Sequence, residues 1–488
     1  MKKLNFAHRS LVAATLLAIM AYAPISALAA GSIVSIVSRD PAGFGFNDPT
    51  PVAPVGGNPG VTLGEQRWNV YRYVADLWAN ELTSSEPITV SAGWEELTCT
   101  ASSAVLGSAG AYNAWYNFPN APVTNTWHGQ ALANKLAGFN LSDGTPDDGS
   151  GYGNVDIKTQ FNVNLGKSDC LAGSSFYLGF DGAHGTDIDF VETLLHELGH
   201  GLGFQTFTSG STGAPYAGLA SAWDRFMLDT TTGKTWTGMT DGERAASALK
   251  GRKLAWTGAQ VTAAIPSVLS LGVPQLSVST PASVAGKYEV GSASFGPALS
   301  YPGMSGELMP VVDQANGVTG LACTPLSAVN TLAVKGRIAL VDRGTCTFSI
   351  KVKNVQAAGA LAVLVADNAA GSPPSGLGGT DPSIIIPAVR ITIDDGAKLK
   401  DALKSRSRTH SGVFVNLGVD MSMRAGADPS GRALLFTPNP YQGGSSVSHF
   451  DTIAFPNLLM EPSINGDLGQ VVKAPKDLTL HLLKDVGW

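Results

Sequence analysis

Residues 196–200 read His-Glu-Leu-Gly-His, a spacing that can hold a metal ion. Two histidines four positions apart on a helix lie one turn apart on one face, so both imidazoles can bind one zinc ion. The glutamate between them can accept a proton from a metal-bound water. A chance match is rare because the chain has eight histidines in 488 residues. We therefore predict His196 and His200 as metal ligands and Glu197 as the general base, against the alternative of surface histidines on an ordinary helix.

The flanking residues predict a helix that can present both imidazoles. Asp189 and Glu192 have the spacing of a capping box, with Asp189 as the N-cap. An apolar stripe at helical spacing falls on the side opposite the two histidines, so the stripe can pack into a core while the imidazoles face a cleft. The stripe comprises Val191, Leu195, Leu198 and Leu202. Three glycines weaken the helix and mark its predicted end, namely Gly199, Gly201 and Gly203.

A third metal ligand is needed, because a catalytic zinc usually has three protein ligands and an open water position. In thermolysin-like enzymes a later glutamate supplies it. The first glutamate after the motif is Glu243, in an Asp-Gly-Glu-Arg segment typical of a solvated turn. In short-spaced metzincins the pattern is H-E-x-x-H-x-x-G-x-x-H, and here the last position is Thr206. The third ligand must therefore come from elsewhere, and Glu243 stays open as an alternative.

His449 lies in a Ser-Val-Ser-His-Phe-Asp segment, and Met460 follows it in Leu-Leu-Met-Glu-Pro. Together with the earlier motif, this arrangement resembles the leishmanolysin-type metzincins, over most of residues 60–228 and 430–488. In that family a large insertion precedes the third histidine, and a methionine forms an apolar floor beneath the zinc. The resemblance implies a zinc endopeptidase with His449 as third ligand and Met460 as Met-turn residue. A loop histidine and an ordinary core methionine are the alternatives.

The segment between His200 and His449, which are 249 positions apart, contains a second pattern. Residues 335–367 alternate between a buried strand, an amphipathic helix and another buried strand, and residues 384–403 continue with a strand and a helix. With its Asp-Arg-Gly-x-Cys-x-Phe segment, the region 285–418 resembles the protease-associated (PA) domain. Arg343-Gly344 could contact a ligand, but a tight structural turn is favoured. We interpret the region as a non-catalytic α/β module that binds or gates substrates.

The predicted fold class is α+β, with a metzincin-like catalytic domain of a twisted sheet and an active-site helix interrupted by the PA module. Residues 30–228 form its first part, 229–284 a linker region, 285–418 the insertion and 430–488 its second part. Residues 30–63 are rich in proline and glycine and are expected to extend over the surface. Helices are expected at 65–82 and 478–486, and strands at 88–91, 156–164 and 175–180.

The N-terminal residues predict export. Lys2 and Lys3 precede an apolar run, and Ala27-Leu28-Ala29 supplies a cleavage signal, so residues 1–29 read as a signal peptide. No later stretch reaches about 18 uninterrupted apolar residues, which predicts a soluble protein outside the cytoplasm, in a periplasm or beyond the cell. A net charge of −6 and 14% charged residues, without a basic block, disfavour nucleic acid and membrane surfaces as partners. Protein or peptide substrates are the expected partners.

Four cysteines in an exported chain suggest two disulfides, for which three pairings exist. The domain division favours Cys99–Cys170 and Cys323–Cys346, and the second pair also fits the PA resemblance. A four-cysteine zinc site is disfavoured because no C-x-x-C spacing occurs. The Asp143–Gly151 segment could bind Ca²⁺, but no glutamate stands at the EF-hand offset, so a solvated turn is favoured. An exported binding protein with a degenerate protease domain is the alternative function.

Overall fold

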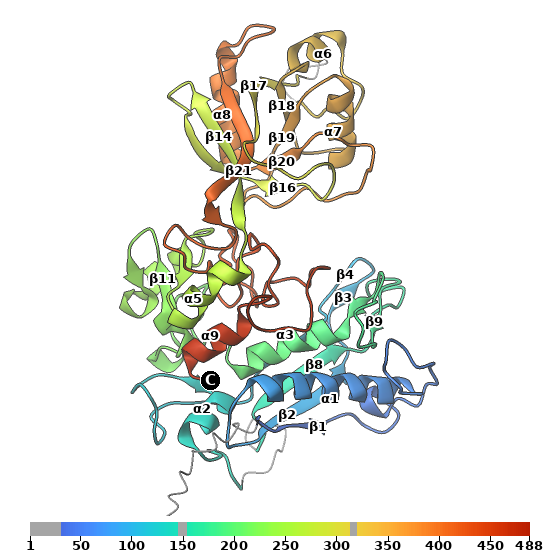
Figure 1. Cartoon of the computed structure of the whole chain (residues 1–488), viewed down its shortest axis with the longest axis vertical. Coiled ribbons are helices and arrows are strands. Elements are labelled where there is room, and N and C mark those ends of the chain that lie inside the picture. Colours follow the sequence, from blue (N-terminus) through green and yellow to red (C-terminus); the bar gives the residue numbers. More distant parts are fainter. Residues whose placement is uncertain (1–30, 145–153, 313–319) are drawn as a thin grey trace, which may run out of the picture.

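The computed structural model describes residues 31–144, 154–312 and 320–488. The predicted signal peptide and most of the candidate calcium loop lie outside these residues. Figure 1 shows a mixed α+β chain in two bodies, a larger one that holds both termini of the described chain and a smaller one that stands over it. Two strands of the smaller body, at residues 271–280 and 414–424, begin and end where the chain passes between the two bodies. Within the described residues, no helix is long and apolar enough to cross a membrane.

A four-stranded sheet organises the larger body, in the order β1-β2-β8-β5. Strands β1 (Val34–Ser38), β2 (Ile88–Glu95) and β8 (Ile157–Asn162) are parallel, and β5 (Gly107–Ala111) is an antiparallel edge strand. The expectation that residues 30–63 extend over the surface is therefore wrong for β1. Its Val-Ser-Ile-Val-Ser sequence has strand propensity, which the surrounding prolines and glycines obscured.

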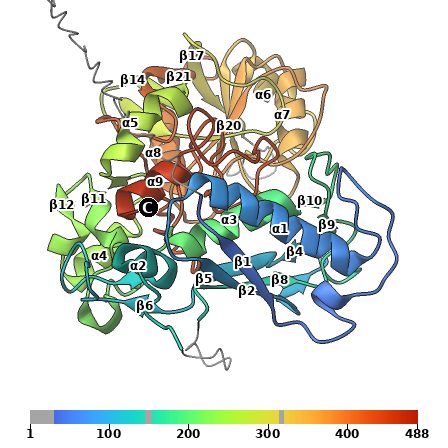
Figure 2. The ribbon, with the colours of Figure 1, turned by 60° about the horizontal axis from the view of Figure 1, so that its bottom comes forward.

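Two helices pack side by side against this sheet, as Figures 1 and 2 both show. Helix α1 (Leu63–Glu81) begins with a capping box between Thr62 and Glu65, and helix α3 (Phe190–Leu202) begins at the N-cap Asp189. Their apolar side chains form one core with the inner face of the sheet. Short elements surround this core: η1 (Gly45–Asn47), β3 (Cys99–Thr100), β4 (Ser103–Ala104), β6 (Ala114–Trp115), β7 (His128–Gly129), α2 (Gln130–Ala137), β9 (Phe176–Tyr177) and β10 (Ile188–Asp189).

Residues 203–270 belong to the same body, although part of this range was predicted to be a linker. Trp236, Trp256 and Ile265 are buried in the core that contains α1 and α3. Burial of large apolar side chains at these positions stabilises the body, which a solvated linker could not do. The elements are η2 (Tyr216–Gly218), η3 (Trp223–Phe226), β11 (Met227–Asp229), β12 (Lys234–Thr235), η4 (Trp236–Gly238), α4 (Asp241–Ser247), β13 (Leu254–Trp256) and α5 (Ala259–Val268).

The smaller body is built on an eight-stranded sheet in the order β15-β14-β21-β17-β18-β19-β20-β16. Strands β17 (Met304–Pro310), β18 (Ile338–Asp342), β19 (Ala362–Ala366) and β20 (Ala388–Ile391) are parallel. The antiparallel strands are β14 (Leu271–Thr280), β15 (Gly286–Glu289), β16 (Gly291–Ser292) and β21 (Phe414–Arg424). The helices are α6 (Ala328–Val334), α7 (Phe348–Ala357), α8 (Ile393–Ala402) and η5 (Leu403–Ser405). The sheet thus spans residues 271–424, a wider range than 285–418.

The chain then returns to the larger body. Residues 425–478 form turns and isolated bridges, such as Ala255 with Leu434 and Leu435 with Phe450. Helix α9 (Thr479–Val486) packs against α5. The indole of the final residue, Trp488, donates a hydrogen bond to the carbonyl of Leu202 at 2.6 Å and so satisfies one acceptor at the end of α3. The last residues of the chain therefore support the helix that carries the His-Glu-Leu-Gly-His motif.

Candidate metal centre

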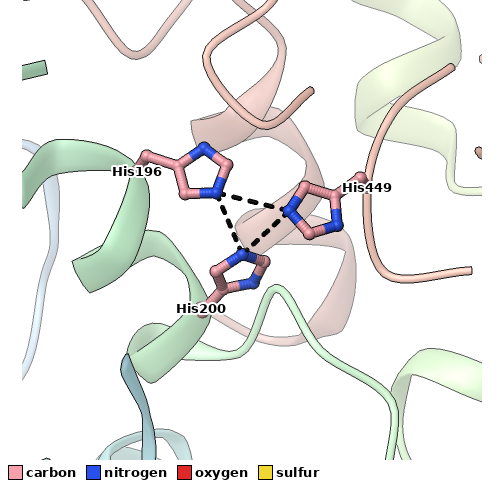
Figure 3. A group of neighbouring side chains, drawn as sticks. All are labelled: His196, His200 and His449. Atoms are coloured by element: carbon pink, nitrogen blue, oxygen red, sulfur yellow. Dashed lines mark hydrogen bonds between the residues drawn. The ribbon is translucent and has the colours of Figure 1, made fainter. Parts of the chain in front are cut away.

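Three imidazoles from two distant parts of the chain converge at the end of α3 (Figure 3). The Nε2 atom of His200 lies 3.1 Å from that of His196 and 3.2 Å from that of His449, and the third distance is 3.3 Å. A tetrahedral zinc with bonds of 2.0–2.1 Å places its nitrogen ligands about 3.3–3.4 Å apart. The triangle therefore has the size of three corners of a zinc coordination sphere.

The other ring nitrogens define which atoms carry protons. Each Nδ1 atom contacts a backbone carbonyl: Leu459 O at 2.7 Å for His196, Phe204 O at 2.7 Å for His200 and Ser445 O at 2.8 Å for His449. Because a carbonyl only accepts, each Nδ1 must donate, which leaves the Nε2 lone pairs free in the neutral rings. Three lone pairs that face one another repel unless a cation lies between them, so the donor set fits a metal ion.

Burial keeps these imidazoles in the form that binds metal. It lowers the pKa of His196 to about 4 and that of His200 to about 3, and it holds the pKa of His449 well below its usual value. All three rings are therefore neutral near pH 7, as metal ligands must be.

Helix α3 is more deeply buried than an amphipathic pattern implies. Residues on both sides of the helix, including Leu194 and His196, are buried. Two of the glycines predicted to weaken the helix serve close packing instead. A Cβ atom on Gly199 would overlap the sulfur of Met460, and one on Gly201 would overlap Ile157. Only Gly203, with φ +128°, acts as the C-cap.

Met460 has no exposed surface, and its sulfur packs against Gly199, which lies between His196 and His200 in the sequence. Its carbonyl accepts a hydrogen bond from the amide of Phe450, next to His449. The preceding residue, Leu459, holds the His196 ring through its carbonyl, and its own amide donates to Asp477 at 2.7 Å. The segment Leu459–Met460 is thus linked directly to His196 and, through Phe450, to the neighbourhood of His449. The sequence analysis did not predict the role of Asp477. It could not predict the carbonyl groups, because backbone acceptors leave no signal in a sequence.

Glu197 lines the same cavity as the three histidines. Burial raises the pKa of its carboxyl group to about 7, and a hydrogen bond from the backbone of Ala109 acts in the opposite direction. A carboxyl group with a pKa near neutrality can both take up and release a proton there, which is the property a general base needs.

The cavity has a volume of about 830 Å³ and runs along edge strand β5. Residues 104–109, 443–445 and 462–464 are among those that line it. Because β5 pairs only with β8 in the sheet, its other edge presents backbone groups to this cavity. An extended peptide can pair with such an edge.

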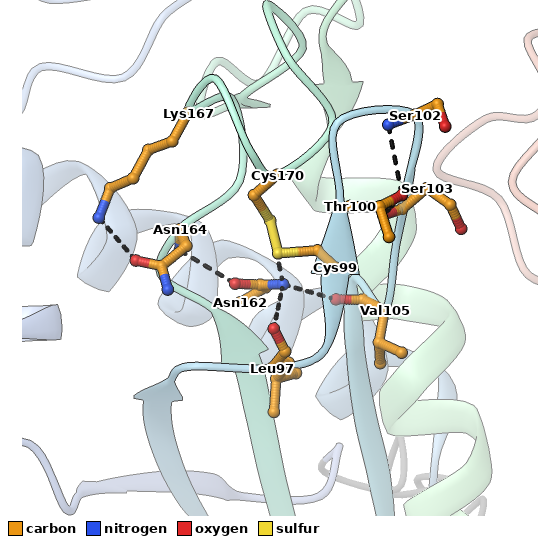
Figure 4. The surroundings of a disulfide bond; sticks show 10 residues. All are labelled: Leu97, Cys99, Thr100, Ser102, Ser103, Val105, Asn162, Asn164, Lys167 and Cys170. Atoms are coloured by element: carbon orange, nitrogen blue, oxygen red, sulfur yellow. Dashed lines mark hydrogen bonds between the residues drawn. A yellow bond between two sulfur atoms is a disulfide. The ribbon is translucent and has the colours of Figure 1, made fainter.

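A disulfide supports the rim of the cavity (Figure 4). Cys99 is bonded to Cys170, next to Leu171, which lines the cavity. Beside the bond, the side-chain amide of Asn162 donates to the carbonyls of Leu97 at 3.3 Å and Val105 at 3.0 Å. These contacts connect strand β8 to the β3–β4 hairpin and fix the rim. The second disulfide, Cys323–Cys346, lies in the smaller body.

The alternative third ligand, Glu243, is not among the residues that line this cavity. Glu243 is the N3 residue of α4, where it bonds Thr240 and Lys234. Thr206 donates to the buried carboxylate of Asp224 at 2.6 Å. In the part of the chain that the structure describes, the three histidines at 196, 200 and 449 are the one group of three or more side chains arranged to hold a metal.

A comparison with protein families identifies part of the smaller body. Residues 304–399, from β17 into α8, match the family model of the PA domain. This region is a PA domain. Vacuolar-sorting receptor 1 of Pisum sativum is 32% identical over 153 residues, 30% of this chain and 23% of the receptor. Signal peptide peptidase-like 2 of Arabidopsis thaliana is 35% identical over 99 residues, 19% of this chain and 17% of that protein.

The chain thus spans about a quarter or less of the length of these curated relatives. Among solved structures, an aminopeptidase from Aneurinibacillus sp. strain AM-1 aligns with a TM-score of 0.24 and 24% identity, over 31% of each chain. A zinc aminopeptidase from Bacillus subtilis aligns with a TM-score of 0.23 and 21% identity, over 33% of this chain and 36% of that one. Likeness at this level does not identify the larger body.

Proposed function

We propose that the chain is an exported zinc-dependent endopeptidase whose larger body is a leishmanolysin-like metzincin domain. The observation that carries the proposal is the triangle of three unprotonated Nε2 atoms, 3.1–3.3 Å apart, in a cavity that also contains Glu197. The packing of the buried Met460 against Gly199, inside the His-Glu-Leu-Gly-His motif, supports the assignment to metzincins.

The residues of the cavity divide the chemistry among them. A zinc ion held by His196, His200 and His449 would supply Lewis acidity, making a bound water more acidic and polarising the scissile carbonyl. Glu197 takes the proton of the attacking water and delivers it to the departing amine. The backbone carbonyls behind the imidazoles fix the ring orientations, so that the three nitrogens stay directed at one point.

The edge strand supports a polypeptide as the substrate. The free edge of β5 can hold an extended chain by backbone hydrogen bonds, which do not depend on side-chain identity. A cavity open along residues 104–109 accommodates peptide residues on both sides of the scissile bond, as an endopeptidase requires. The two disulfides are typical of an oxidising compartment and fit export.

Metal content and hydrolysis of a protein substrate test the proposal. The purified chain should contain one zinc per molecule and cleave casein, and a chelator should abolish cleavage until zinc is restored. Glu197→Gln should keep the zinc and lose about 10²–10⁴-fold in rate. The matched control is Glu243→Gln, at a half-buried glutamate outside the cavity whose capping role glutamine preserves. Casein hydrolysis by Glu197→Gln at the wild-type rate would overturn the assigned role.

A second candidate is an exported binding protein whose metal site is degenerate. The relatives that support it are called vacuolar-sorting receptors, and the PA domain is a separate module in this chain. A chain that binds polypeptides but retains no zinc and cleaves nothing would favour this function. The presence of all three histidines in one group supports the peptidase function over this alternative.

A further inference from the structure

A second cavity, of about 840 Å³, lies between the PA-bearing body and the larger body. The start of β14, strand β16 and the 297–299 and 373–376 segments form its upper wall. Phe436, Pro438 and residues 452–455 form its lower wall. Both bodies therefore contribute to one binding space, whose volume is in the range of ligand sites.

This cavity meets the zinc cavity at three residues. Ser445, Pro462 and Ser463 line both spaces. Ser463 is exposed and the other two are half-buried, so they form an accessible crossing and not a sealed partition. Ser445 also holds the His449 ring through its carbonyl. A chain bound beside the histidines can therefore continue across this crossing into the second cavity.

The lining of the second cavity is nearly uncharged. Arg252 is the charged side chain among the residues that line it. Its guanidinium lies 3.5 Å from the carboxylate of Asp451 and 3.6 Å from that of Glu289. Glu289 also pairs with Lys253 at 3.8 Å, so two cations face two carboxylates. The remaining lining residues are prolines, glycines, alanines, other apolar residues and small or uncharged polar residues.

Two large apolar side chains of this lining are exposed. Leu271 is 50% exposed and Phe455 is 60% exposed. The two lie close in space, since the amide of Ser270 donates to the carbonyl of Phe455 at 2.8 Å. Exposed apolar surface beside a concave, neutral wall favours an apolar ligand.

We propose that the second cavity binds a distal segment of the polypeptide substrate, extended, uncharged and apolar, while the scissile bond lies at the histidines. This assignment rests on the proposed peptidase function and locates the contribution of the PA-bearing body to substrate recognition. Because the two cavities share three lining residues, the occupant we infer is the substrate itself. Because the charge of Arg252 is compensated by its ion pairs, the segment we expect is uncharged.

Quenched fluorescent peptides test this site on the full chain. A short peptide that occupies only the zinc cavity is compared with versions extended at either end by about eight apolar residues, which reach roughly 27 Å. One extension should raise kcat/KM by about tenfold or more, because burial of a single large apolar side chain contributes that much. The same extension built from acidic residues should give no gain.

A cavity-filling variant links the gain to this site. Ala298 is exposed on the upper wall, so Ala298→Trp should fill the cavity without disturbing the core and abolish the gain from the extension. Val329→Trp is the matched control, at a 54% exposed position on α6 that does not line the cavity, and should keep the gain. Equal kcat/KM for all peptides, or an equal gain in both variants, would overturn the proposal.

Binding measured without hydrolysis separates this proposal from the peptidase function. The labelled extension alone should bind Glu197→Gln by fluorescence anisotropy, and Ala298→Trp in that background should weaken binding about tenfold. If the chain binds the extension in this way but cleaves no peptide, the proposed peptidase function is wrong and the proposed binding site remains. Cleavage without such binding would overturn the site alone. Ala298-dependent dimers in sedimentation would instead assign the cavity to a second copy of the chain.

Discussion

The sulfur of Met460 lies 2.8 Å from the point where a Cβ atom would stand on Gly199, inside the His-Glu-Leu-Gly-His motif. Real Cβ atoms do not approach a sulfur this closely, so a side chain at position 199 would displace the thioether of the fully buried Met460. The fourth residue of the motif, which offers no ligand, therefore limits how closely the turn at Met460 can approach helix α3.

We expect Gly199→Ala to displace Met460 and the carbonyl of Leu459 that holds His196. Overpacking of this kind costs about 1–3 kcal/mol of folding free energy. Thermal unfolding and zinc retention would measure both effects, and Met460→Ala in the same background should restore part of the zinc affinity. Gly242→Ala is the control, since a Cβ atom added to this glycine of α4 would meet no atom within 4 Å. Unchanged stability and zinc binding in Gly199→Ala would contradict the packing argument.

We expect His449→Ala to lose tightly bound zinc, because two imidazoles alone leave the coordination sphere incomplete. Zinc content after dialysis, measured by mass spectrometry, checks this outcome. His410→Ala is the matched control, since its ring is 74% exposed and contacts Glu307 in the PA-bearing body. Stoichiometric zinc in the His449 variant would move the third ligand to another residue.

The buried carboxyl group of Glu461 predicts a pH-dependent stability. Burial raises its pKa to about 8, against 4.5 for the unperturbed group. Between these values the folded chain keeps a proton that the unfolded chain releases, so the free energy of unfolding falls as pH rises from about 4.5 to 8. Glutamine stays neutral and keeps an acceptor for the amide of Leu458, which Glu461 binds at 2.8 Å.

Glu461→Gln should therefore show a smaller decline and exceed the wild type in stability above about pH 8. Urea unfolding at a series of pH values from about 5 to 9 would compare the two proteins. Parallel curves over this range would show that the carboxyl group does not retain its proton in the folded chain.

Removal of the rim disulfide should affect substrate binding more than metal binding. Replacing Cys99 and Cys170 by serine costs about 2–5 kcal/mol of stability and loosens the segment that carries Leu171. We expect a several-fold higher KM for short peptides with zinc retained. The equivalent change at Cys323 and Cys346 should leave that KM unaltered, because this pair lies in the PA domain. An unchanged KM in the variant that lacks Cys99 and Cys170 would show that the rim does not contribute to substrate binding.

The sequence located the side chains of the candidate site but not the contacts that orient them. Spacing singled out His196 and His200, the family resemblance implied His449, and the structure brings the three side chains together. The carbonyls that hold their Nδ1 atoms belong to Phe204, Ser445 and Leu459, and backbone groups have no sequence signature. The glycines of the motif were interpreted through helix propensity, whereas tertiary packing determines their role.

The fold was predictable where patterns are local. The α1 helix, the α3 helix and the strand–helix alternation of the PA domain follow from periodicity. Strand β1 lies in a segment whose prolines and glycines mask it. Strand β14 was placed in a linker because its partner, β21, lies more than 130 residues away, and such a pairing leaves no local trace.

The pairing of Leu271 on β14 with Arg424 on β21 joins the two ends of the insertion. Once the PA-bearing body has folded, the path from His200 to His449 contracts from 249 residues to the 71 before Leu271 and the 25 after Arg424. The entropy lost on closing such a loop grows as (3/2)RT ln n, so this contraction lowers the cost of assembling the triangle by about 1 kcal/mol. The folded insertion thus holds the two ends of the intervening segment together. The long separation of His200 and His449 in the sequence therefore adds little to the entropy lost when the three imidazoles come together.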